Sequence, residues 1–219
     1  MTIIKIFRLI PTQYIEDFYK DGSIRLTNIK KWRTDENKAI EDKKEGYFNN
    51  RVIDSETGAT SILNNVDNPK NEILGNFYGM SFTMEVNLGT CVDFAFDGFW
   101  INDIILFANV INEHILCHSG FFYNKCNYVE GGYYQRYDSF RENGMLSERG
   151  TLLIGNGLFQ MAINNQNDPN HLFTKDSYYS DQQEFRIIWE TANNFGDYLY
   201  LKCPELRQLC YRINGINYF

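Results

Sequence analysis

The chain has no surplus of basic residues: 21 lysines and arginines stand against 28 aspartates and glutamates, for a formal net charge of −7. A broad nucleic-acid-binding face normally needs a basic surface, so the composition argues against one. The densest cationic run, Lys30-Lys31-Trp32-Arg33, is followed at once by acidic residues and is typical of a solvated surface. A local basic groove is still compatible with this balance.

Long apolar runs are also absent. No uninterrupted apolar stretch approaches the roughly 20 residues of a membrane-spanning helix, and the segment Met1–Ile10 is too short and too charged for a signal peptide. Five cysteines, an odd number without dense spacing, do not describe a disulfide framework and fit a reducing compartment. We therefore expect a soluble, cytoplasmic protein with no membrane partner.

Glycine-rich phosphate loops are missing as well. Gly131-Gly132 and Gly155-Asn-Gly157 lack the spacing of a Walker or dinucleotide-binding motif and are typical of hairpin or bulge positions. The sequence therefore does not imply Rossmann-type binding of NAD.

Aromatic residues, by contrast, are abundant, at 16% of 219 residues. Aromatic side chains pack well on a pleated surface and favour strands. The length fits one domain with a real core, and neither an internal repeat nor a low-complexity linker divides it. We predict a single strand-rich α+β domain over residues 1–219, with a few short helices.

The first 27 residues indicate strand, helix, glycine turn and strand. Ile3–Ile10 is an apolar β-branched run closed by Pro11. Thr12 is expected to cap a helix through Lys20, with Gly22 just past its end, and Ser23–Thr27 alternates as a second strand. Residues 30–70 predict a polar surface excursion, of the kind that often serves as a lid or recognition loop, with an edge strand at Tyr47–Ile53.

Further elements follow from apolar periodicity. Ile104–Cys117 fits either a helix or a strand, and Pro204 is expected to open a short terminal helix. Glu184–Glu190 and Tyr198–Leu201 suggest a late hairpin. The other segments expected to be extended are Ile73–Val86, Thr90–Phe96, Trp100–Phe107, Phe121–Tyr134 and Thr151–Leu158.

Three groups of polar residues stand on predicted strands. Arg8 lies near the centre of the first strand, where a charge is either an outward edge residue or an anion anchor. Ser81 and Thr83 are two positions apart on a middle strand, so they share a face. Gln182 and Glu184 have the same spacing at the start of a late strand. Glu184 is also two positions from Arg186, a spacing that permits an ion pair on one face.

In this chain order, Arg8, the Ser81-Phe-Thr83 strand and the Gln182-X-Glu184 strand after a tyrosine-bearing turn resemble the Arg-Ser-Glu class of ADP-ribosyltransferases. The opening strand–helix–Gly22 unit resembles the N-terminal unit of such domains. Leu172–Ile188 is also similar to the end of a large, little-characterised bacterial family with a Glu-X-Glu-X-Arg-like strand. Phe82 departs from the usual Ser-Thr-Ser motif. These short motifs cover about a quarter of the chain.

The resemblance implies a split-sheet domain that uses NAD as a substrate and transfers ADP-ribose to a macromolecule, protein or nucleic acid, or hydrolyses NAD. Small stand-alone domains of this kind would fit an effector or toxin role. Glu184 would stabilise the charge that develops on the ribose, and Ser81 would orient it. Gln182 would align an acceptor other than arginine. Tyr178 and Tyr179 would contact that acceptor, while Arg8, Tyr78, Ser81 and Thr83 would bind NAD.

Two other interpretations compete with this enzyme. The first is a non-enzymatic binding module on the same scaffold, in which Arg8 and Glu184 form a buried ion pair. The second is a zinc hydrolase built on His114, Cys117, His118 and Cys126, although a second Cys-X-X-Cys pair is missing. A catalytic dyad of Cys117 or Cys126 with His171 is conceivable, but nothing in the sequence places these residues together.

Overall fold

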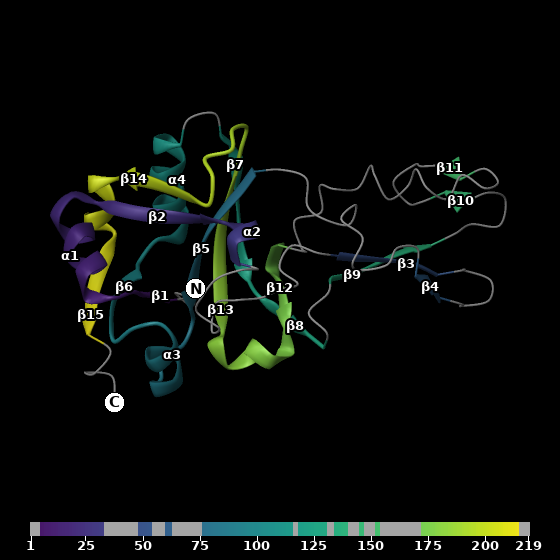
Figure 1. Cartoon of the computed structure of the whole chain (residues 1–219), viewed down its shortest axis with the longest axis horizontal. Helices are drawn as coiled ribbons and strands as arrows, with labels where there is room; N and C mark the ends of the chain where they lie inside the picture. Colours follow the sequence, from purple (N-terminus) through teal and green to yellow (C-terminus); the bar gives the residue numbers. More distant parts are fainter. Residues whose placement is uncertain are drawn as a thin grey trace.

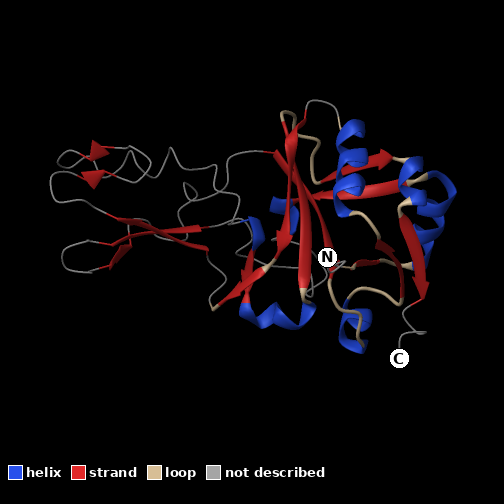
Figure 2. Cartoon of the chain, turned by 180° about the vertical axis from the view of Figure 1, so that it is seen from behind, coloured by secondary structure: helices blue, strands red, loops and turns tan. Residues whose placement is uncertain are grey.

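The main body of the structure is one antiparallel sheet with helices packed against it (Figures 1 and 2). The structure is a computed structural model and describes residues 5–32, 48–53, 60–62, 76–115, 118–130, 134–139, 145–146, 152–153 and 172–214. The predicted strand-rich α+β class is confirmed.

Strand β5 is the branch point of the eight-stranded main sheet. One edge of β5 pairs along its whole length with β13, which pairs in turn with β7. The other edge pairs with both β2 and β1. The eight strands are β1 (Ile6–Leu9), β2 (Ser23–Asn28), β5 (Asn76–Thr83), β6 (Asp97–Ile101), β7 (His118–Lys125), β13 (Glu184–Thr191), β14 (Tyr198–Lys202) and β15 (Cys210–Asn214).

Strands β2 and β1 pair with different parts of the same edge of β5. β2 pairs with it at Gly79, whereas β1 pairs with it at Thr83. Met80–Phe82 therefore has no strand partner on this edge among the strands that the structure describes. β2 continues outward to β14, and β1 continues to β6 and β15. Two groups of strands thus diverge from this edge of β5, on either side of Met80–Phe82.

The N-terminal unit shows why the sequence signals were informative. Helix α1 (Thr12–Asp21) buries Ile15 and Phe18 and ends at Gly22, which has φ 76°. A Cβ at Gly22 would lie 2.3 Å from the Cys203 carbonyl oxygen, so both conformation and space require glycine. The predicted helix and its glycine stop are confirmed. The predicted Thr12 cap is wrong, because Thr12 is already helical and Pro11 precedes it.

Two predicted strands are wrong, because side-chain caps begin helices in segments whose apolar residues suggested strands. Instead of a strand at Thr90–Phe96, the chain forms α3 (Leu88–Asp93), which begins with a capping box between Asn87 and Thr90. The predicted strand Trp100–Phe107 ends at Ile101 in β6. The Asp103 side chain then caps helix α4 (Ile104–His114). The segment Ile104–Cys117, which fitted either a helix or a strand, is therefore helical through His114.

The predicted late hairpin is also wrong. β13 and β14 are both strands, but β14 pairs with β2, matching Tyr198 to Thr27, while β13 pairs with β5 and β7. The 3-10 helices η3 (Ser177–Gln182) and η4 (Pro204–Gln208) flank these strands in sequence, and the short helix predicted at Pro204 is confirmed as a 3-10 turn.

Smaller sheets lie beside the main one (Figure 1). β3 (Phe48–Ile53) lies between β4 (Thr60–Ile62) and β9 (Tyr134–Ser139). The strand predicted here is confirmed, but its predicted position at a sheet edge is wrong. β12 (Thr174–Asp176) pairs with β8 (Asn127–Val129), and β10 (Met145–Leu146) with β11 (Leu152–Leu153). Apart from these strands and the short α2 (Ile29–Trp32), the predicted excursion over 30–70 lies outside the described residues, as does most of the extended segment predicted at Thr151–Leu158.

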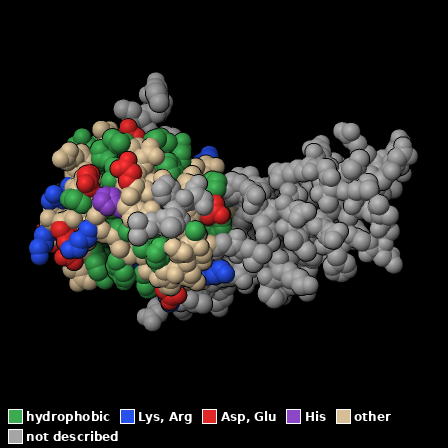
Figure 3. Space-filling view, turned by 90° about the horizontal axis from the view of Figure 1, so that it is seen from above, with side chains coloured by type: hydrophobic (Ala, Val, Ile, Leu, Met, Phe, Trp, Pro, Cys, Tyr) green, Lys and Arg blue, Asp and Glu red, His purple; other side chains and the backbone are tan. Residues whose placement is uncertain are grey.

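The main core lies where α1, α4 and η4 pack on the sheet, and its largest side chain is Trp189. The Trp189 indole donates to the Ala108 carbonyl oxygen at 3.3 Å, which satisfies its only polar atom. Figure 3 shows acidic, basic and apolar side chains interspersed on one face. Within the described ranges, no helix has both the length and the apolarity to cross a membrane.

Candidate functional site

A cleft of about 510 Å³ opens where β1 and β2 diverge from β5. Ser81 lines it, on the stretch of β5 that has no strand partner at this edge among the described strands. Arg8 from β1, Arg25 from β2 and Glu184 from β13 also line the cleft. Side chains from four separate strands therefore meet in one concave space, which is the usual form of a ligand site.

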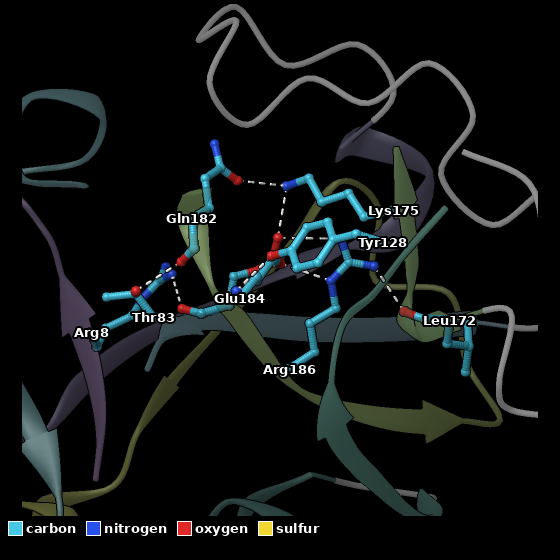
Figure 4. A network of polar contacts seen from close by, with 9 residues as sticks. Arg8, Thr83, Tyr128, Leu172, Lys175, Gln182, Glu184 and Arg186 are labelled. Carbon is cyan, nitrogen blue, oxygen red and sulfur yellow. Dashed lines mark hydrogen bonds and ion pairs between the residues drawn. The ribbon is translucent and has the colours of Figure 1, made fainter. Parts of the chain in front are cut away.

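Glu184 is the centre of a polar network inside this cleft (Figure 4). Its Oε1 accepts from Ser81 Oγ at 2.6 Å and from Arg186 Nε at 2.7 Å. Its Oε2 accepts from Lys175 Nζ at 2.7 Å. The Glu184 backbone N–H donates to Tyr128 Oη at 2.7 Å. The carboxylate is thus fixed on both oxygens.

The network is buried, with 5% of Glu184 and 1% of Arg186 exposed. Burial opposes ionisation of Glu184, but Arg186 and Lys175 outweigh this effect and hold its carboxyl pKa well below the ordinary 4.5. Glu184 is therefore a permanent anion at neutral pH. Its environment makes it an electrostatic partner for a cation and a poor proton donor.

The strand register explains how these side chains converge. Arg186 pairs with Ser81 across β13 and β5, and Glu184 is two positions from Arg186, so all three share one face. Arg186 is held further by the Leu172 carbonyl oxygen at 2.8 Å and by the Trp32 ring at 5.0 Å. The predicted spacing for an ion pair between Glu184 and Arg186 is confirmed, although the pair is buried.

Arg8 reaches the unpaired part of β5. Its Nη1 donates to the Ser81 carbonyl oxygen at 2.5 Å, which gives that backbone group a partner where no strand does. Burial and the nearby charge of Arg25 lower the Arg8 guanidinium pKa from 12.5 to about 10, against the attraction of Glu184. Arg8 lines the cleft and so is not an outward-facing edge residue, and its role as an anion anchor stays a prediction.

Gln182 and Glu184 come together by a route other than the predicted one. Gln182 ends the 3-10 helix η3, and Gln183 adopts the left-handed conformation, so the strand begins only at Glu184. The two side chains do not share a strand face through pleating. Instead, buried Lys175 links them, since its Nζ lies 2.9 Å from Gln182 Oε1 and 2.7 Å from Glu184 Oε2.

The remaining predicted site residues lie around the cleft and do not line it. Tyr78 is fully buried on the opposite side of β5, where its hydroxyl contacts Asn194 and Gly196. Thr83 Oγ1 lies 2.8 Å from the Gln182 carbonyl oxygen and borders a small adjoining cavity. Tyr178 is 84% exposed, and the Tyr179 ring lies 4.8 Å from Lys175 Nζ.

Sequence reasoning missed Lys175, Arg25, Trp32 and Tyr128. Lys175 could have been noticed, because a charge directly after the apolar pair Leu172-Phe173 and Thr174 is unusual. Arg8 is unusual in the same way, as a charge within the apolar strand β1. The other three missed residues carried no such signal, because their positions depend on pairing between distant segments.

Of the alternative metal and thiol residues, His114 contacts Glu205 at 3.3 Å and Cys126 is buried. Cys117, His171 and the side chain of His118 lie outside the described residues. Over the described residues, no group of three or more His, Cys, Asp or Glu side chains converges as a metal site.

Comparison with known proteins indicates neither a ligand nor a reaction for this cleft. The chain matches no protein-family model, no curated protein and no solved structure.

Proposed function

We propose that the chain is an NAD-dependent ADP-ribosyltransferase that uses this cleft. The observation that carries the proposal is the meeting of Arg8, Ser81 and Glu184 in one open cleft, with Ser81 bonded to the Glu184 carboxylate. The divergence of β1 and β2 from β5 supports it too, because an ADP-ribosyltransferase-like fold would hold NAD between two parts of a split sheet.

The reaction would break the bond between ribose C1′ and the nicotinamide nitrogen, and the bonding electrons would leave with nicotinamide. Positive charge then builds on the ribose, as in glycoside hydrolysis. Glu184, held as an anion and oriented by Ser81, would stabilise that charge more strongly in the transition state than in the ground state. An acceptor nucleophile or water would then bond to C1′ and release a proton.

Gln182 and the two tyrosines would face the acceptor. Lys175 holds Gln182 beside Glu184, and Tyr178 is exposed at the preceding turn. By the resemblance, glutamine at this position accompanies acceptors other than arginine. The expected acceptor is therefore another group on a macromolecule, either protein or nucleic acid.

One observation favours a second candidate, a binding module without catalysis. Both oxygens of Glu184 are already engaged by Ser81, Lys175 and Arg186. A carboxylate neutralised in this way stabilises a ribosyl cation less than a solitary one. In this alternative the cleft would capture a ligand and leave it intact.

Incubation of the protein with labelled NAD and cell lysate distinguishes the two candidates. We expect transfer of the label by the wild type and none by Glu184→Gln, with both shown to be folded by circular dichroism. Ser81→Ala keeps the buried ion pairs, so it is the variant less prone to misfold, and it should slow transfer roughly tenfold to a hundredfold by loosening Glu184. Glu205→Gln, an exposed carboxylate away from the cleft, is the control.

Equal labelling by the wild type and folded Glu184→Gln would contradict the transferase. NAD binding without nicotinamide release would support the binding module.

A further inference from the structure

The cleft is cationic although the chain is acidic. Four basic side chains and two carboxylates line it, which gives its lining a net charge of +2 against −7 for the whole sequence. These residues are Arg8, Arg25, Lys175, Arg186, Asp17 and Glu184. Lys175 and Arg186 are already paired with Glu184. The two other cations of the lining are Arg8 and Arg25.

Neither of these arginines has a carboxylate partner within ion-pair distance in the described part of the chain. Arg8 bonds to a backbone carbonyl, and the Arg25 guanidinium lies 4.6 Å over the Tyr198 ring. Their mutual repulsion is one reason why the Arg8 pKa is lowered. Two guanidiniums that repel each other inside a concave space are stabilised when an anion lies between them.

Strand pairing sets Arg25 facing into the cleft. Ser23, Arg25 and Thr27 lie on one face of β2 and line the cleft, and Ile24 between them also borders it. Arg25 pairs directly with Tyr200 of β14, which is 69% exposed and lines the same space. An exposed aromatic ring thus borders the cleft beside Arg25.

Five residues of the cleft lining are linked, each to the next. Tyr200 is paired with Arg25, and Arg25 is close enough to Arg8 to perturb it. Arg8 bonds to the backbone of Ser81, whose hydroxyl bonds to Glu184. These neighbours link the Tyr200 ring, the two arginines and the anionic network of Glu184 within one cleft.

We infer that Arg25 is a second phosphate-binding residue, which holds the α-phosphate of a nucleoside diphosphate whose base lies against Tyr200, while Arg8 holds the β-phosphate next to Ser81. Planar guanidinium groups bind phosphate oxygens bidentately, and aromatic rings stack on bases. The choice of a nucleotide rests on the proposed function, whereas the two-arginine anion site rests on the geometry alone.

Calorimetric titration of the full chain with AMP and ADP tests this order. Arg25→Gln should weaken both nucleotides alike, because both carry the α-phosphate. Arg8→Gln should weaken ADP and leave AMP nearly unchanged, because only ADP reaches that guanidinium. Each loss is expected to be roughly tenfold to a hundredfold, the size of a charge-assisted hydrogen bond. Lys202→Gln, an exposed cation on the same β2–β14 pair outside the cleft, should change neither affinity.

The inference is overturned if Arg25→Gln leaves both affinities intact, if the two arginine variants show the reverse pattern, or if wild-type protein binds neither nucleotide. It stands independently of catalysis. The expected AMP and ADP pattern without NAD cleavage would refute the transferase and leave the nucleotide site. NAD cleavage with unchanged nucleotide affinity in Arg25→Gln would do the opposite.

Discussion

Replacing Glu184 by glutamine should destabilise the fold as well as alter the cleft. The substitution leaves the ammonium of Lys175 and the guanidinium of Arg186 buried against a neutral amide. Breaking a buried ion pair by removing one partner costs about 3–5 kcal/mol. Because the total stability of a domain is about 5–15 kcal/mol, the variant would lie near the threshold of unfolding.

A double-mutant cycle isolates the pair from the rest of the network. Lys175→Met alone leaves Glu184 with Arg186 and Ser81, so we expect a smaller loss, of about 1–3 kcal/mol. In the double variant the lysine charge is gone, and the total loss should fall short of the sum of the single losses by about 0.5–3 kcal/mol. Urea unfolding followed by tryptophan fluorescence measures all four proteins, since Trp32 and Trp189 are buried.

The same carboxylate predicts a dependence of stability on pH. Its pKa in the fold lies below the ordinary 4.5, so its contribution is complete above pH 4.5 and declines as the pH falls from there toward the folded-state pKa. Glu184→Gln should lack this acid-dependent component. Additive losses in the cycle, or a cost of Glu184→Gln below about 0.5 kcal/mol, as for a surface substitution, would refute the buried-pair reasoning.

Three further substitutions test the supports of the site. Gly79→Ala would place a Cβ 2.6 Å from the Trp32 ring, and we expect a loss of about 1–3 kcal/mol with altered tryptophan emission; an unchanged urea midpoint would contradict the contact. Asn87→Ala removes the α3 capping box and should lower the free energy of unfolding by about 1 kcal/mol, whereas no change would mean that the cap contributes nothing. Lys202→Gln should raise the Asp21 pKa from about 2 toward 3.8 in an NMR titration, and a static pKa would contradict the pairing. The wild type loses the contribution of this pair as the pH falls from 3.8 toward 2, whereas the variant lacks it throughout.

Local sequence signals predicted local structure well. The helix ending at Gly22 and the strands on either side followed from spacing and glycine conformation, and the structure has them. The failures have local causes too. The apolar residues of Thr90–Phe96 suggested a strand, but the capping box between Asn87 and Thr90 begins helix α3 there.

Long-range pairing lay beyond this reasoning. The late hairpin failed because β14 pairs with β2, more than 150 residues earlier in the chain. The candidate site likewise contains residues that the sequence predicted and residues whose contacts depend on long-range packing. Arg8, Ser81 and Glu184 were predicted as a group and share the cleft. The sequence marks Lys175 as an unusual charge, but its bond to Glu184 depends on the placement of β12 beside η3.

Release of nicotinamide from NAD, measured without lysate or acceptor, tests the central claim most directly. Wild-type protein and the Glu205→Gln control should release nicotinamide at equal rates, Ser81→Ala should release it more slowly, and folded Glu184→Gln should release none. No release by folded wild-type protein, or equal release by wild-type protein and folded Glu184→Gln, would contradict the account.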